Sequence, residues 1–152
     1  MKLKYIFSIA VLLIALISCR EKLPIDENKI ENEIKGVLIQ QASEWNKGDL
    51  EGYMFGYIKS DSLRFASGGT ISFGWDTTLA RYKRGYPDKS IMGHLTFSRI
   101  DVNIISDNAA LAFGQWELVR ENDKPWGLFT LLFRKTDLGW RIVHDHTSSS
   151  TN

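Results

Sequence analysis

Two histidines, His144 and His146, are the side chains of this sequence best suited to proton transfer near neutral pH. Residues two apart share one face of a strand, so the pair would point the same way as Trp140 and Ile142 if this segment is a strand. Asp145 would then lie on the opposite face and would not orient either imidazole. The spacing therefore supports a histidine acting as general acid or base.

The same histidines, with His94 as a third ligand, have the right residue types for a zinc site. On a strand, however, positions two apart are separated by roughly 6 to 7 Å, and few rotamers bring both side chains to one ion. We therefore expect no metal and no other cofactor. The chain contains neither a Gly-x-Ser-x-Gly elbow nor a phosphate-cradling glycine loop, so it supports neither a serine hydrolase nor a phosphate-binding loop.

The elements that would position these residues are helices first and strands afterwards. Apolar residues recur at helical spacing over 30–45, behind a capping box of Asn28 and Glu31. Two shorter helices follow, capped by Asp49 and Asp76. Strand patterns cover 62–67, 70–74, 94–105, 109–120, 127–135 and 139–147. This order predicts an α+β domain with an antiparallel sheet.

The middle strands are apolar on both faces, over 109–116 and 128–133. One face can pack on the helices, whereas the other needs cover that a second copy of the chain supplies most simply. We therefore expect a homodimer through the sheet. The net charge of +1 argues against a nucleic-acid partner, and we interpret the basic cluster Arg81, Lys83 and Arg84 as the solvent-exposed face of a helix.

The first residues form a targeting segment rather than part of the fold. Two lysines precede an apolar run from Tyr5 to Ile17, which is too short to span a bilayer comfortably as a helix. The run ends in Leu16-Ile17-Ser18-Cys19, which resembles a lipobox and implies acylation of Cys19. Cys19 is the only cysteine, which excludes a disulfide within the chain.

We accordingly predict a lipoprotein of the bacterial cell envelope, held to a membrane outside the cytoplasm through Cys19 alone. The predicted parts are a signal peptide over 1–18, a lipid-anchored tether over 19–27, a domain over 28–149 and a tail over 150–152.

Two motifs together resemble a known family. Trp45-Asn46-Lys47-Gly48-Asp49-Leu50 resembles the first helix-to-helix junction of nuclear transport factor 2-like proteins. The segment from Gly139 to Ser148 resembles the last strand of their SnoaL-like branch and of the calcium/calmodulin-dependent kinase II association domain. The order of elements between the motifs also matches. The resemblance implies a curved sheet wrapped around helices into a cone, with a pocket at its open end and usually a dimeric assembly.

Within such a cone, the histidine pair would be the polar part of the pocket and aromatic side chains its wall, although each aromatic alone is better explained as core. The residues that we expect to line the pocket are Tyr53, Tyr57, Arg64, Trp75, Tyr82, Trp116, His144 and His146. Arg64 would offer its charge to a carboxylate. Alignment with ketosteroid isomerases places 63–66, without an acid, where their base lies, and Gln41 where their tyrosine lies. Their mechanism is therefore not expected.

The function that we predict is binding of a small, partly apolar or carboxylate-bearing molecule in the cone, without turnover. Two alternatives stay open. One is an isomerase, cyclase or dehydratase that uses His144 or His146 as general acid and base. The other is a structural dimerisation or assembly module.

Overall fold

Asp26 begins the first helix of the computed structural model, which describes residues 24–150. Helix α2 spans Glu27–Lys47, and the Asp26 side chain accepts a hydrogen bond of 3.0 Å from the backbone N–H of Lys29. The predicted capping box at Asn28 and Glu31 is therefore wrong, because Asp26 already takes the capping position. One face of α2 is buried at the helical spacing that the sequence predicts, by Ile30, Ile34, Leu38, Gln41 and Trp45.

Three shorter helices follow α2. Helix α3 spans Leu50–Met54, and its cap is the predicted Asp49, which accepts from the backbone N–H of Gly52 at 2.8 Å. Helix α4 spans Trp75–Gly85, with Gly74 rather than Asp76 at the capping position. Helix α5, Lys89–Met92, was not predicted, because a single turn is too short to show a hydrophobic period.

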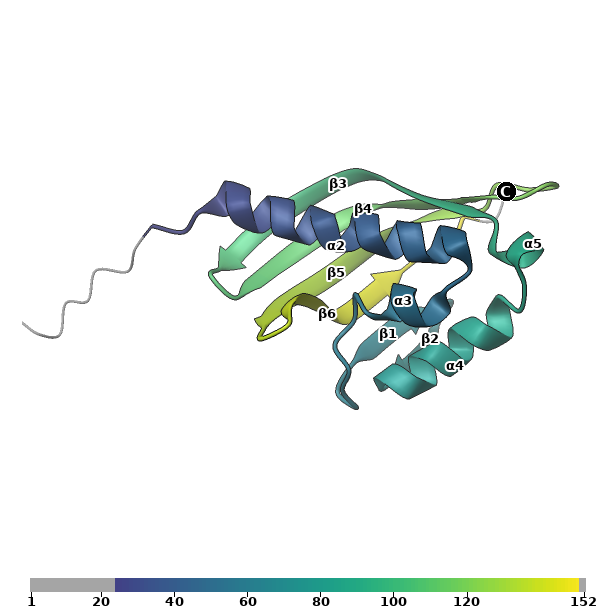
Figure 1. The fold of residues 1–152 in the computed structure, drawn as a ribbon, viewed down its shortest axis with the longest axis horizontal. Coiled ribbons are helices and arrows are strands. Elements are labelled where there is room, and N and C mark those ends of the chain that lie inside the picture. Colours follow the sequence, from purple (N-terminus) through teal and green to yellow (C-terminus); the bar gives the residue numbers. More distant parts are fainter. Residues whose placement is uncertain (1–23, 151–152) are drawn as a thin grey trace, which may run out of the picture.

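Six strands form one curved sheet in the order β2-β1-β6-β5-β4-β3 (Figure 1). Their bounds are β1 Arg64–Ser67, β2 Thr70–Phe73, β3 His94–Ser106, β4 Ala109–Val119, β5 Trp126–Thr136 and β6 Gly139–Thr147. Helix α2 lies across β3 to β5, and α4 lies beside β1 and β2 (Figure 1). The α+β fold class and the strand positions are confirmed.

The sheet is mixed rather than wholly antiparallel, because β1 runs parallel to β6. The chain that leaves α3 already follows β6 in the same direction. The backbone N–H of Ile142 donates to Gly56 and the N–H of Ile58 donates to Ile142, both at 2.9 Å. Strand β1 continues in this direction, and β2 then turns back antiparallel to it at the edge of the sheet.

A β-bulge interrupts strand β6 at Val143. Phe133 of β5 pairs with Ile142, but the preceding residue, Leu132, pairs with His144. Strand β6 therefore advances by two residues where β5 advances by one, and Val143 is the extra residue without a partner in β5. From this point on, the side chains of β6 face the opposite way from the strict two-residue alternation on which the sequence analysis relied.

The predicted signal peptide over 1–18 and the lipidation site Cys19 lie outside the described residues. The predicted tether over 19–27 and tail over 150–152 lie partly outside them. Within residues 24–150, no helix is long and apolar enough to cross a membrane.

Candidate functional site

A cavity of about 190 Å³ opens between the inner face of the sheet and helices α2 and α4. An apolar cavity of about 150 Å³ can hold benzene, so this volume suits a molecule of about one substituted ring. Its lining residues are Gln41, Trp45, Tyr53, Tyr57, Phe65, Ser67, Arg81, Tyr82, Gly85, Tyr86, Leu95, Phe97, Trp116, Leu118, Phe129, Leu131, Asp145, Thr147 and Ser149.

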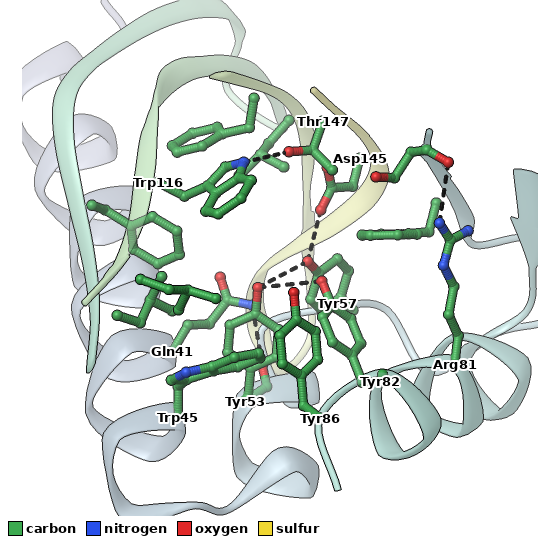
Figure 2. Close-up of a pocket in the computed structure, with 18 of the residues that line it drawn as sticks. Gln41, Trp45, Tyr53, Tyr57, Arg81, Tyr82, Tyr86, Trp116, Asp145 and Thr147 are labelled. Carbon is green, nitrogen blue, oxygen red and sulfur yellow. Dashed lines mark hydrogen bonds between the residues drawn. The ribbon is translucent and has the colours of Figure 1, made fainter. Parts of the chain in front are cut away.

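Three tyrosine hydroxyls and one carboxyl group meet in this cavity (Figure 2). The hydroxyl of Tyr57 donates to Oδ2 of Asp145 at 2.7 Å. The hydroxyl of Tyr53 lies 3.5 Å from the hydroxyls of both Tyr57 and Tyr82. The other carboxyl oxygen, Oδ1 of Asp145, is buried and has no hydrogen-bond partner among residues 24–150. Such an oxygen is an acceptor, or once protonated a donor, that a ligand can satisfy.

Burial sets the protonation of this cluster. It raises the pKa of Asp145 from 3.8 to about 7, although the hydrogen bond from Tyr57 and the charge of Arg81 both act to lower it. Burial also raises the pKa of Tyr53, Tyr57 and Tyr82, so their hydroxyls stay neutral at physiological pH. The cavity therefore combines one carboxyl group that titrates near neutrality with hydroxyl groups that do not titrate there.

An aromatic wall surrounds the polar cluster. The ring of Trp45 packs edge-on against Tyr53, Tyr82 and Tyr86, with centroid distances of 5.1, 5.9 and 4.7 Å. Towards β6, the indole N–H of Trp116 donates to the hydroxyl of Thr147 at 2.9 Å (Figure 2). These contacts fix the rings, so that the cavity has an aromatic wall of defined shape.

Four of the predicted pocket residues line the cavity: Tyr53, Tyr57, Tyr82 and Trp116. Two others do not. Arg64 is exposed on β1, and Trp75 donates its indole N–H to the backbone oxygen of Met54 at 2.9 Å, beneath the first turn of α4.

The histidines also lie away from the cavity. The bulge at Val143 turns Asp145 and Thr147 inward, and it leaves His144 and His146 on the outer face of β6. The expectation of a histidine-lined pocket is corrected accordingly. His146 is exposed and His144 is half-buried. Burial, followed by the charges of Arg64 and His146, lowers the pKa of His144.

Two residues of the site, Asp145 and Arg81, were not predicted from the sequence. Asp145 was assigned to the face opposite the histidines, which is correct, but the cavity lies on that face. Arg81 was grouped with Lys83 and Arg84, which are indeed exposed, whereas Arg81 is half-buried and lines the cavity. Arg81 lies one helical turn after Thr78, whose burial is known only from the structure, so no pattern in the sequence marked it.

No group of three or more His, Cys, Asp or Glu side chains within residues 24–150 is arranged to hold a metal ion. His94 lies at the start of β3, distant in the sheet order from the histidines of β6.

Comparison with protein families shows that the model of the SnoaL-like domain matches residues 34–151. No curated protein matches the chain.

Among solved structures, a nuclear transport factor 2-like protein of unknown function from Shewanella oneidensis is 44% identical, with a TM-score of 0.74. The alignment covers 77% of this chain and 97% of that one. A ketosteroid isomerase-like protein from Erwinia carotovora atroseptica is 16% identical, with a TM-score of 0.66 over 84% of this chain and 100% of that one. A putative scytalone dehydratase from Novosphingobium aromaticivorans is 11% identical, with a TM-score of 0.63 over 79% and 83%. The last two share only the fold.

Proposed function

The chain belongs to the SnoaL-like domain family of the nuclear transport factor 2-like superfamily, and we propose that its domain binds a small, partly apolar molecule of about one ring in the cavity. One observation carries this proposal. Asp145 lines the aromatic cavity, and one of its carboxyl oxygens is buried without a hydrogen-bond partner among residues 24–150. A buried polar group that lacks a partner is costly to the fold, and a bound ligand would offset that cost.

The polar cluster defines what the ligand must offer. Near neutral pH the Asp145 carboxyl is present in both its protonated and its ionised form, because its pKa is about 7. The protonated form donates to a carbonyl oxygen, and the ionised form accepts from a hydroxyl group. A ring that carries an oxygen substituent therefore fits both the wall and the polar cluster.

A second candidate function is proton transfer on such a molecule. The observation that favours it is a carboxyl group with a pKa near neutrality beside neutral tyrosine hydroxyls. Asp145 would take or give the proton, and a hydroxyl of the tyrosine cluster would hold the negative charge that develops on an oxygen of the substrate. This places the general acid and base at Asp145 rather than at the histidines considered from the sequence.

Filling the cavity tests the binding proposal. Leu131 lines the cavity and its neighbour Leu132 lies on the outer face of β5, so Leu131→Phe and Leu132→Phe add the same atoms to opposite sides. The test is a thermal-shift screen of ring-sized carbonyl and hydroxyl compounds. We expect a compound that binds to raise the melting temperature of the wild type and of Leu132→Phe by several degrees. Leu131→Phe should lose that gain. A compound that stabilises both variants equally binds elsewhere and contradicts the proposal.

We also propose that the protein is a homodimer through the outer face of the sheet. Side chains on that face form continuous rows across neighbouring strands: Arg64 pairs with His144, His144 with Leu132, and Leu132 with Leu111. Phe113, which is 43% exposed, lies in the adjacent row. Burying apolar side chains of an open sheet face is more favourable than leaving them in water. A second copy of the chain offers a matching apolar surface for this.

The envelope location is a further proposal, and it rests on the Leu16-Ile17-Ser18-Cys19 motif alone. Cells that express the full chain should incorporate a labelled fatty acid into it and hold it in the membrane fraction. Cys19→Ala should abolish both the label and the membrane retention. A soluble, unlabelled wild-type chain would contradict the lipid anchor.

A further inference from the structure

Arg81 is a half-buried cation inside the cavity that takes part in none of the ion pairs of residues 24–150. Its guanidinium donates instead to two neutral oxygens, the hydroxyl of Ser72 at 3.2 Å and the backbone oxygen of Ser67 at 3.1 Å. A guanidinium has five N–H groups, so these two bonds leave donors for a ligand. A partly buried charge without a counter-ion favours an anion beside it.

The position of Arg81 is fixed rather than loose. Its guanidinium carbon lies 5.0 Å from the centre of the Phe65 ring, in a cation–π contact. Phe65 in turn packs edge-on against Tyr82, one residue along α4 from Arg81. The two bonds to Ser67 and Ser72 hold the other side of the guanidinium. The forked set of N–H donors on the guanidinium is therefore held in place before a ligand binds, which reduces the conformational entropy lost on binding.

Arg81 and Asp145 lie close enough to act on one small molecule. Phe65 pairs with Asp145 across β1 and β6, and neighbouring strands lie about 4.8 Å apart. Arg81 lies over that same Phe65 ring, and its charge acts on Asp145. Figure 2 shows the Arg81 side chain extending from α4 toward the end of the cavity at which Asp145 and Thr147 lie.

We propose that Arg81 binds the carboxylate of the ligand, so that the cavity takes small ring-bearing carboxylic acids in their anionic form. This inference rests on the proposed function and names its ligand class. The carboxylate meets the guanidinium in a charge-assisted pair, the ring lies against the aromatic wall, and a substituent on the ring reaches Asp145. Arg64, which the sequence suggested for this role, lies on the outside of the sheet.

Calorimetric titration with benzoate and its neutral counterpart benzamide tests the role of Arg81. We expect the wild type to bind benzoate about tenfold more tightly than benzamide, and Arg81→Gln to lose that preference. Arg84→Gln, an exposed arginine on the same helix, is the matched control and should keep it. Arg81→Lys keeps the charge but not the fork, so it should retain part of the preference.

The outcomes separate this inference from the proposed function. Equal binding of the two probes to wild type overturns the role of Arg81 and leaves the cavity as a site for neutral molecules. A benzoate preference that survives in Arg81→Gln also overturns that role, because another group then binds the carboxylate. Binding of neither probe at millimolar concentration contradicts the inference and the proposed function together. If Arg81→Gln does not fold, an Arg81→Lys variant that keeps the full benzoate preference of the wild type overturns the role of the guanidinium.

Discussion

Replacing Asp145 with asparagine is expected to stabilise the protein at pH 8, by about 2 to 4 kcal/mol. The reason is the burial that raises the pKa of this carboxyl group from 3.8 to about 7. Between these two values the folded protein holds a proton that the unfolded chain has already released. The free energy of unfolding of the wild type therefore falls as the pH rises through this window, and it stays low above pH 7. Asparagine has nearly the same shape and can still accept the bond from Tyr57, but it carries no charge.

Urea denaturation at pH 4, 6 and 8 measures this effect. The advantage of Asp145→Asn should be small at pH 4 and should grow up to pH 8. Asp107→Asn, in the exposed turn between β3 and β4, is the matched control and should follow the wild type at every pH. A variant that is less stable than wild type at pH 8, or that has the same pH slope, would show that Asp145 is not a buried carboxyl group in solution. The same variant should lose the binding of hydroxyl compounds, because the amide nitrogen that replaces the free carboxyl oxygen donates a hydrogen bond but cannot accept one.

Phe113→Lys is expected to convert the proposed dimer into a monomer. Phe113 is paired with Thr130, which is itself paired with His146, so it lies well inside the outer face of the sheet. A lysine there would bury an ammonium group against the apolar side chains of the proposed interface. The loss of a large central aromatic side chain, together with this charge, should weaken the dimer at least about a hundredfold.

Sedimentation velocity of protein that begins at Glu21 measures the assembly at micromolar concentration. Leu138→Lys is the matched control, since Leu138 is 74% exposed and lies in the turn between β5 and β6. This control should remain dimeric. A wild-type protein that sediments as a monomer, or a Phe113→Lys variant that stays dimeric, would rule out the sheet face as the interface.

Most of the fold could be predicted because each long element follows one period from end to end. The buried residues of α2 recur at helical spacing, and the bounds of β6 were predicted as observed, at Gly139 and Thr147. The parallel pairing of β1 with β6 could not be predicted in this way. It depends on a contact between Gly56 and Ile142 that are far apart in the sequence, and no local pattern records it.

The candidate site was predicted in part, and one extra residue in β6 explains why the wrong face of that strand was chosen. The tyrosines were found because aromatic residues at helical spacing must face inward. The choice between Asp145 and His146 depended on which side chains of β6 point into the cavity. One extra residue at Val143 reverses that direction for the rest of the strand. A bulge has no sequence signature as clear as a period, so alternation alone selected the wrong face. Arg81 was missed for a different reason, because a charge on a helix is usually in solvent.

If a small ring binds in the cavity beside Asp145 and Arg81, it must contact the leucines that line the cavity. Nuclear magnetic resonance of protein with labelled leucine methyl groups, titrated with benzoate, measures this contact. We expect shifts for the cavity leucines Leu95, Leu118 and Leu131, and none for the leucines of the outer face, Leu111, Leu128 and Leu132. Shifts confined to the outer face, or no shift in any of the six, would contradict binding in the cavity.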